Sequence, residues 1–511
     1  MRHEKKFIRS QTFRNFTLPD VSKIQPQTII PRHLLPKEIT APEADTQGWD
    51  AASAIRLSQV NQALKATGVS PASFSKEINA SWYANGDFGT WTMTRGGSGS
   101  IVFLKAPITT ASMTMATSKL DFNDGSVTFQ VKLKYLPQPV DKETTDGTPN
   151  NLLTDANARS PEDPAVVVQH IDYGDSTPSL ELKALFQSII GIWLNENLEI
   201  FNYIFAVVAL NQLSQSPQFD WLKPTYTSYA YYDGNPETPG EDEAYFGVLT
   251  MTNGNAPTGL ANQLPASAIP DGQGGAFLVG SKLFMENMIL PAAQAAFPDA
   301  SASNFSIVNG NTAIELVEPL DLEKVKVGAI WYQPTATSML IQIVGDEIQT
   351  RMDIHIPISP GIDAYVQTES WNRLELVDKP DGTQTIGWVE SREPKKTHYY
   401  KKADWVVITE IIVSVIGIVA AIVGGAAVSG IVRVVVVIII GIIAGLAAAT
   451  PTIIAEAISK GAAEALPPLE NMMVEFTKPI AWPDTTGFVL SSVQINGSLQ
   501  FAGNFSIGSQ S

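Results

Sequence analysis

The sequence predicts an α+β protein in which curved, mostly antiparallel sheets wrap around long helices. Three observations predict this class. Several segments alternate apolar and polar residues as half-buried strands do, others carry the three-to-four-residue apolar spacing of helices, and a run of Val and Ile near the C-terminus is almost uncharged. The βαβ alternation of a parallel nucleotide-binding sheet is missing, so a doubly wound fold is not expected.

The strand prediction is clearest in two regions. Apolar side chains recur at every second position from Val127 to Tyr135. Residues 312–400 contain further alternating runs, and Asp381-Gly382 stands between two of them with the composition of a hairpin turn. Alternation of this kind marks strands with one buried face, which is typical of antiparallel sheets.

Helices are expected in three places. In residues 46–68, apolar side chains from Trp49 to Leu64 can share one face, and Gly68 can end the helix. A second helix is predicted from about Leu180 to Trp193, and a third is suggested in residues 280–297. Their amphipathic spacing predicts that each buries one side against a sheet.

Composition divides the chain into an arm and a body. Residues 1–46 are basic and contain five spaced prolines, which prevent regular helix and favour extended chain. This arm either docks on a partner or is a plain disordered tail. The body, residues 47–511, is expected to contain two modules, about 47–215 and 216–511, with an apolar insertion at 405–460.

Charge and motifs exclude several classes of protein. A net charge of -17 argues against a nucleic-acid partner, which needs clustered Lys and Arg. The chain has no cysteine, its five histidines are far apart, and the dipeptide Gly-Lys of a phosphate-binding loop does not occur. We therefore expect no enzyme, no catalytic residue, no metal and no cofactor. The N-terminus lacks the apolar core of a secretory signal.

The Val/Ile run is the strongest functional signal. Between Trp405 and Ile454 only Glu410 and Arg433 are charged, and residues 424–430 could form the turn of a helical hairpin. Length permits three interpretations: a buried hairpin in a core, a surface hidden in solution and released on a membrane, or a constitutive transmembrane hairpin. The candidate lipid or membrane contacts share this run; they are Trp405, Ile411, Ile412, Val415, Ile418, Arg433, Val434, Ile438 and Ile442.

A resemblance to a known family rests on the order of several phrases. They are "GTWTMTRGGSGSIVFLKAPI" (89–108), "GSVTFQVKLKYL" (125–136), "SKLFMENMILP" (281–291) and "KPIAWPDTTGFVLSSVQINGSLQFAG" (478–503). In this order, from about residue 46 onward, the chain resembles the 47-kDa accessory protein family of clostridial neurotoxin gene clusters, together with its OrfX neighbours. The N-terminal arm is not part of that pattern.

The resemblance implies a tubular lipid-binding (TULIP-like) fold with an apolar groove. It implies a non-enzymatic accessory protein of a bacterial toxin system that binds lipid or contacts a membrane, with a lipid or fatty acyl chain as its ligand. The implied partners are a lipid or membrane surface and the toxin or other accessory proteins of the same cluster. Such a protein would be made in the bacterial cytoplasm and released, if at all, by a route other than Sec.

On this basis residues 406–454 would line the groove or leave it. Arg433 would then extend to the interface or meet a lipid headgroup. Two other interpretations stay open. One is a structural or assembly protein whose apolar run is ordinary core and whose arm anchors it to a complex, and the other is the soluble form of a pore-forming toxin.

Overall fold

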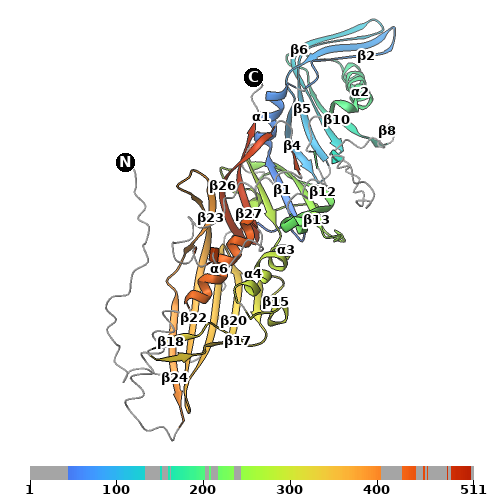
Figure 1. The fold of residues 1–511 in the computed structure, drawn as a ribbon. Coiled ribbons are helices and arrows are strands. Elements are labelled where there is room, and N and C mark those ends of the chain that lie inside the picture. The colour runs from blue at the N-terminus through green and yellow to red at the C-terminus, as the bar shows by residue number, and fades with distance from the viewer. Residues whose placement is uncertain are drawn as a thin grey trace. The chain divides into compact units, whose positions relative to one another are not determined.

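The computed structural model is built mainly of antiparallel sheets with few helices (Figure 1). Residues Thr40–Ser511 form one compact unit. The residues that the structure describes are 44–68, 70–99, 101–132, 150–151, 159–160, 163–201, 207–208, 217–234, 243–297, 299–327, 329–403, 428–444, 453–454, 457, 480–481 and 485–507.

A six-stranded sheet joins strands from both ends of the chain. Its order is β12 (Pro224–Tyr232), β13 (Tyr245–Thr252), β1 (Ala51–Arg56), β14 (Gly275–Val279), β27 (Ser498–Ile507) and β26 (Thr485–Asn496). Every residue of β13 and β14 is buried, so both faces of the sheet are covered there. Ala44, the first described residue, donates its N–H to the Asn496 carbonyl at 2.8 Å.

The prediction of a helix in residues 46–68 is wrong for the first half of that segment. Residues Ala51–Arg56 form β1, and only Leu57–Thr67 form the helix α1, which ends as predicted at Gly68 with φ 60°. The run of Ala and Ser in β1 carries little intrinsic preference for a strand. Pairing with β13 on one side and β14 on the other decides the conformation, because tertiary context overrides weak local propensity.

A second six-stranded sheet carries the predicted alternation. Its order is β10 (Val166–Asp172), β6 (Ser118–Lys132), β5 (Ile101–Met115), β3 (Trp82–Phe88) and β2 (Ser73–Asn79), and β4 (Thr92–Ser98) also pairs with β5. Val127, Phe129 and Val131 of β6 are fully buried, which confirms the period-two prediction. Leu133 and Tyr135 lie outside the described residues.

The helix predicted after Leu180 is confirmed as α2 (Leu180–Glu196). The Ser179 hydroxyl accepts a hydrogen bond from the Leu182 N–H and so caps its first turn. The helix packs on β2, β3 and β10. Phe186 lies in an aromatic cluster, with ring centroids 5.2 Å from Phe122 and 6.0 Å from Tyr173.

An eight-stranded sheet is built from the region predicted to be the richest in strands. Its order is β15 (Phe305–Val308), β16 (Ala313–Leu316), β20 (Thr335–Val344), β21 (Glu347–Ser359), β22 (Ile362–Asp378) and β23 (Gln384–Glu390), with β17 (Leu320–Asp321) on β20 and β24 (Lys395–Lys402) on β22. The predicted Asp381-Gly382 turn joins β22 to β23, and Gly382 has the positive φ of 85° that the turn requires.

The third predicted helix is confirmed between Ser281 and Ala295, where α3 (Ser281–Phe284), a π-helical turn η8 (Met285–Ile289) and α4 (Leu290–Ala295) follow without a break. Pro291 has no N–H to donate, which accounts for the altered hydrogen bonding just before it. Helix α6 (Val428–Ala444) follows later in the chain and is almost entirely apolar. It has the same length as α2, and these two are the longest of the described helices.

The remaining described elements are short. They are β7 (Asn150–Asn151), β8 (Arg159–Ser160), β9 (Asp163–Pro164), β11 (Val207–Val208), β18 (Val325–Val327), β19 (Ile330–Tyr332), β25 (Ile480–Ala481) and the 3₁₀ turns η3 (Leu198–Phe201), η5 (Pro217–Leu222), η7 (Ala266–Ala268) and η9 (Ala302–Asn304).

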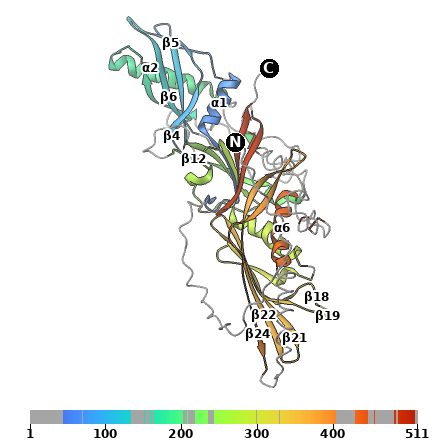
Figure 2. The same ribbon diagram turned by 90° about the vertical axis from the view of Figure 1, so that its left-hand side faces the viewer.

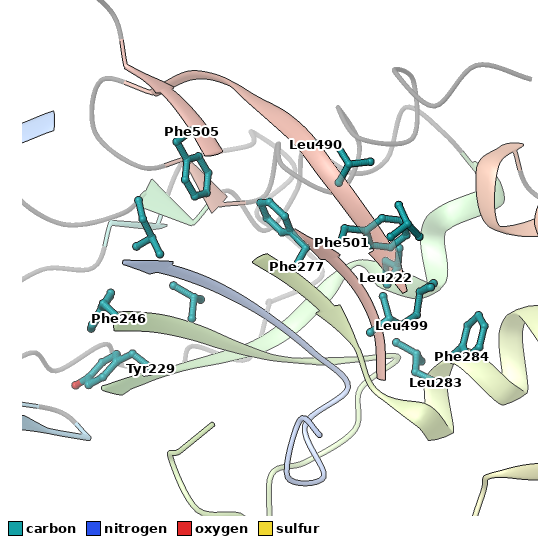
Figure 3. Packing of buried hydrophobic residues seen from close by; sticks show 14 of the residues in the cluster. Leu222, Tyr229, Phe246, Phe277, Leu283, Phe284, Leu490, Leu499, Phe501 and Phe505 are labelled. Carbon is teal, nitrogen blue, oxygen red and sulfur yellow. The ribbon is translucent and has the colours of Figure 1, made fainter. Parts of the chain in front are cut away.

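A single large cluster of buried apolar residues connects the sheets and helices. Figure 3 shows part of it, with Phe277 of β14 and Phe505 of β27 on one side and Leu283 and Phe284 of α3 near Leu499 on the other. Phe277 meets Phe488 edge to face at 5.1 Å. The continuity of this cluster joins α3 to the strand β27 near the C-terminus.

The predicted fold class is therefore confirmed in its antiparallel sheets, while helices make up a smaller part than expected. An apolar helical hairpin is not shown, because α6 is the helix whose bounds are described in the run, and residues 404–427 and 445–452 on either side of it lie outside the described part of the chain. The division of the body near residue 215 stays a prediction. The six-stranded sheet that contains β1 takes its other strands from residues 224–507.

Phe186→Ala should lower the free energy of unfolding by about 3–5 kcal/mol, because it leaves a cavity in the aromatic cluster under α2. Ile192→Ala is the matched control on the same helix, where the side chain is 38% exposed and the expected change is below about 1 kcal/mol. Urea unfolding followed by circular dichroism measures both. Equal stabilities of the two variants would contradict the packing of α2.

Candidate lipid-contacting site

The described part of the Val/Ile run is a buried helix. Helix α6 packs against α4, η8, β22 and β23 (Figure 1). All its Val and Ile side chains from Val434 to Ile443 are at most 1% exposed. A helix that is apolar on every side needs apolar surroundings all round. Here the sheet supplies one wall and the helix Ser281–Ala295 supplies another.

The candidate contacts divide into two groups. Val434, Ile438 and Ile442 lie in α6 and are fully buried in the main apolar cluster. Trp405, Ile411, Ile412, Val415 and Ile418 lie outside the described residues. With Arg433, which also lies in α6, the structure brings four of the candidates together in one helix, and their contact with lipid stays a prediction.

Arg433 has a partner within the chain. Its Nη2 donates to the Glu323 carboxylate at 2.8 Å, and the two side chains are 25% and 62% exposed. Glu323 lies between β17 and β18, 110 positions before Arg433 in the sequence. This ion pair ties the N-terminal part of α6 to the connection that leads into the β18–β19 hairpin. In the described part of the chain, no helix combines the length and the apolar composition needed to cross a bilayer.

A charged cluster on the eight-stranded sheet was not predicted. The carboxylate of Glu347, only 2% exposed, lies 3.3 Å from Arg373 and 2.8 Å from Arg392. The guanidinium of Arg392 also lies over the ring of Trp371 at 5.5 Å, and Lys395 covers the same ring at 4.8 Å. Glu347 comes directly after the turn from β20, and its partners come from β22 and from the residues before β24.

A polar row continues from this cluster across the sheet. The Gln342 amide donates to Gln349, the Gln349 amide donates to Glu369, and Arg351 reaches Glu369 at 2.6 Å. Lys395 completes the row at 3.7 Å from Glu369. These side chains satisfy one another across four strands, so the row stabilises strand register.

Titratable groups elsewhere have structural explanations. Burial raises the pKa of the Tyr173 hydroxyl to about 12. Burial also raises the pKa of Tyr245, whose hydroxyl donates to the Pro265 carbonyl at 2.8 Å. Among the residues that the structure describes, no three His, Asp or Glu side chains are grouped as metal ligands. Each of these shifts arises from packing a tyrosine into a core.

Two further exposed features lie at the β18–β19 hairpin and on β24. Ile330 and Trp331 are 58% and 60% exposed at the hairpin. Strand β24 carries exposed lysines and Tyr399, which is 41% exposed, while Tyr400 packs against the main apolar cluster. The hairpin escaped prediction because its phrase, "VKVGAIWY" (325–332), is too short for periodicity to show which side chains are exposed.

The chain matches known proteins over most of its length. A family model described as OrfX-like, covering the proteins OrfX2, OrfX3 and P47, matches residues 46–503. This chain belongs to the OrfX-like family. The match confirms the resemblance to the accessory proteins of clostridial neurotoxin gene clusters.

Relatives and a solved structure agree with this membership. Protein OrfX3 of Paraclostridium bifermentans is 27% identical over 494 residues, which cover 91% of this chain and 99% of that protein. Protein OrfX3 of Clostridium botulinum (strain Kyoto / Type A2) is 26% identical over 417 residues, covering 75% and 84%. The structure of P47 from Clostridium botulinum A2 is similar in fold, with a TM-score of 0.64 at 16% identity over 90% of this chain and 98% of that one.

Glu347→Ala should lower the free energy of unfolding by about 2–4 kcal/mol, because two guanidinium groups lose their shared buried carboxylate. The half-exposure of Arg373 and Arg392 keeps the loss at the lower end of that range. Glu375→Ala, on an exposed position of β22, is the control and should change stability by less than about 0.5 kcal/mol. Chemical unfolding measures both, and a loss below about 1 kcal/mol for Glu347→Ala would contradict a structural role of the cluster.

Proposed function

We propose that this OrfX-like protein is a non-enzymatic accessory protein of a bacterial toxin system that binds lipid or contacts a membrane. Membership of the family supports the accessory role, and the names of the relatives are not those of enzymes. The observation that carries the lipid part is α6, a helix with Val or Ile on every side of its described core.

The same proposal includes a tubular lipid-binding architecture. In it α6 forms part of an apolar interior between the eight-stranded sheet and the helix Ser281–Ala295. The contacts of α6 with β22, β23, η8 and α4 support this arrangement. The residues that would meet an acyl chain are Val434, Ile438 and Ile442, with Trp405, Ile411, Ile412, Val415 and Ile418 of the same run.

Energetics limit how α6 could reach a lipid. Nine Val and Ile side chains between Val434 and Ile443 are at most 1% exposed. Moving all nine into water would cost roughly 14–27 kcal/mol, at about 1.5–3 kcal/mol for each side chain. That is as large as or larger than the whole stability of an ordinary domain. Helix α6 can therefore leave its site only directly into another apolar medium, such as a bilayer.

The Arg433–Glu323 ion pair would hold the rim of this site in solution. Both side chains are partly exposed, so the pair contributes at most about 1 kcal/mol and can be broken at small cost. On a membrane the guanidinium would be free to meet a lipid phosphate, which is one of the two roles expected for Arg433 from the sequence.

The complete burial of α6 also favours a second candidate function. A structural or assembly protein would keep the Val/Ile run permanently as core and would use other surfaces, including the basic residues 1–46, to bind a partner complex. In that case no lipid accompanies the purified protein and α6 never leaves its site.

A cross-link between Glu323→Cys and Arg433→Cys should abolish most membrane binding that depends on α6. The native chain has no cysteine, so a short bis-maleimide joins only these two partly exposed positions. The cross-linked protein and the same double variant blocked with a monofunctional maleimide are floated with liposomes, and lipid that co-purifies with the native chain is extracted and analysed.

Three outcomes separate the candidates. Flotation of the blocked variant without flotation of the cross-linked one supports release of α6. Equal flotation of both variants would leave lipid contact standing but would show that it does not depend on release of α6. If nothing floats and no lipid co-purifies, lipid binding is wrong and the assembly function is favoured.

A further inference from the structure

The β18–β19 hairpin exposes an aromatic and aliphatic tip beside lysines. Its register pairs Lys326 with Trp331 and Val327 with Ile330. Val325 and Val327 pack against the main apolar cluster, whereas Trp331 is 60% exposed and Ile330 is 58% exposed. The Lys326 ammonium lies 5.7 Å from the centre of the Trp331 ring. The outward face of this hairpin therefore combines a large apolar side chain with a cation.

Strand β24 supplies a second set of such side chains. Residues Lys395–Lys402 contain four lysines and no acidic residue, in a chain of net charge -17. Tyr399 stacks on Tyr365 of β22 at 5.0 Å with an interplanar angle of 12°. The Lys401 ammonium lies 5.0 Å from the centre of the Tyr365 ring. The aromatic pair and the lysine are held together on the same side of the sheet.

The strand register places both features at one end of the eight-stranded sheet. Thr335, His355, Tyr365 and Tyr399 stand opposite one another in successive strands. The hairpin precedes Thr335, and Lys401 follows Tyr399, so both lie beyond this row in the same direction. Figures 1 and 2 agree, since the β18–β19 hairpin lies beside the end of the eight-stranded sheet that carries β24 and the adjoining end of β22 in both views.

The carboxylates near these lysines each contact another side chain. Asp363 contacts His355 Nε2 at 2.9 Å, and Asp321 accepts a hydrogen bond from the Thr335 hydroxyl at 2.7 Å. Glu323 is paired with Arg433. In the described part of the chain Lys324, Lys326 and Lys401 make no ion pair with a carboxylate; all three are exposed. These lysines remain available to an external anion.

We propose that this end of the eight-stranded sheet with the adjoining hairpin, called here the lysine–tryptophan edge (Lys324, Lys326, Ile330, Trp331, Tyr399 and Lys401), is where the protein docks on an anionic lipid bilayer. Trp331 and Ile330 enter the headgroup layer, where tryptophan is favoured. The lysines face lipid phosphates while their alkyl chains cover the aromatic rings. The inference deepens the proposed membrane contact and rests on it, but it does not require α6 to leave its site.

The choice of a bilayer over an acidic protein follows from the combination of side chains. Charge complementarity alone would suit either partner. A projecting tryptophan next to isoleucine at a hairpin tip adds apolar surface that a fluid interface accepts without a matching pocket. A protein partner would have to supply such a pocket, whereas the headgroup layer of a bilayer accepts the side chains without one.

Trp331→Ala should weaken binding to vesicles of phosphatidylcholine with phosphatidylglycerol by about tenfold. Lys326→Gln with Lys401→Gln should weaken it by about 25-fold at low salt, since each lysine near an anionic surface is worth about fivefold. The lysine pair should have little effect on vesicles of phosphatidylcholine alone. Binding is measured by flotation over a range of lipid concentrations and at two salt concentrations.

Matched controls test whether the position of these residues matters. Trp82→Ala removes another exposed tryptophan, 39% exposed at the start of β3, and Lys65→Gln with Lys105→Gln removes two exposed lysines elsewhere. These controls should bind as the native chain does, and Trp331→Phe should restore most of the loss. Melting temperatures of all variants show whether each remains folded.

The outcomes distinguish this inference from the function on which it rests. If the native chain floats and every edge variant floats equally well, the lysine–tryptophan edge is not the docking surface while membrane contact stands. A loss with the lysine variant alone, and none with Trp331→Ala, would overturn insertion of Trp331 into the headgroup layer and leave only an electrostatic contact with lipid phosphates. If the native chain binds neither vesicle and carries no lipid, the proposed function itself fails and the inference fails with it.

Discussion

The backbone pairing of β1 between β13 and β14 is the contact on which the rest of the structure depends. It joins a segment near residue 50 to strands that follow roughly two hundred residues later. The small side chains of "AASA" (51–54) suit this crowded position. At the end of the strand, buried Arg56 donates to the carbonyls of Glu243 and Ile269 at 2.8 and 2.9 Å. Its charge is thereby satisfied by backbone oxygens that fix the surrounding connections.

The sequence predicts those parts of the fold that local periodicity controls. Strand β6 and helix α2 bury side chains in regular patterns, so their type was predictable. Strand β1 was not, because Ala and Ser have little strand preference and the deciding partners are distant. Hydropathy alone cannot tell a buried helix from a membrane span, so the position of α6 needed the structure. The Arg433–Glu323 pair was equally hidden, since its members are 110 residues apart.

Helix α6 and the lysine–tryptophan edge are separate features with one physical connection. Glu323, which holds Arg433, is followed directly by Lys324 at the base of the β18–β19 hairpin. Anionic phosphates near that lysine would also compete with Glu323 for the guanidinium of Arg433. Docking at the lysine–tryptophan edge would thus weaken the Arg433–Glu323 ion pair beside α6. The two steps can be ordered, with surface contact first and exposure of the Val/Ile helix second.

The position of β14 has a consequence for biosynthesis. It lies between β1, near residue 50, and β27, near residue 500, so the six-stranded sheet stays incomplete until the ribosome has passed residue 507. At about 5–20 residues per second, β1 waits roughly 20–90 s for that sheet to close. The elements that contact α6, namely η8, α4, β22 and β23, all precede it in the chain, so its buried site can form before the Val/Ile run leaves the ribosome. The order in which the segments are synthesised therefore limits aggregation of the most apolar one.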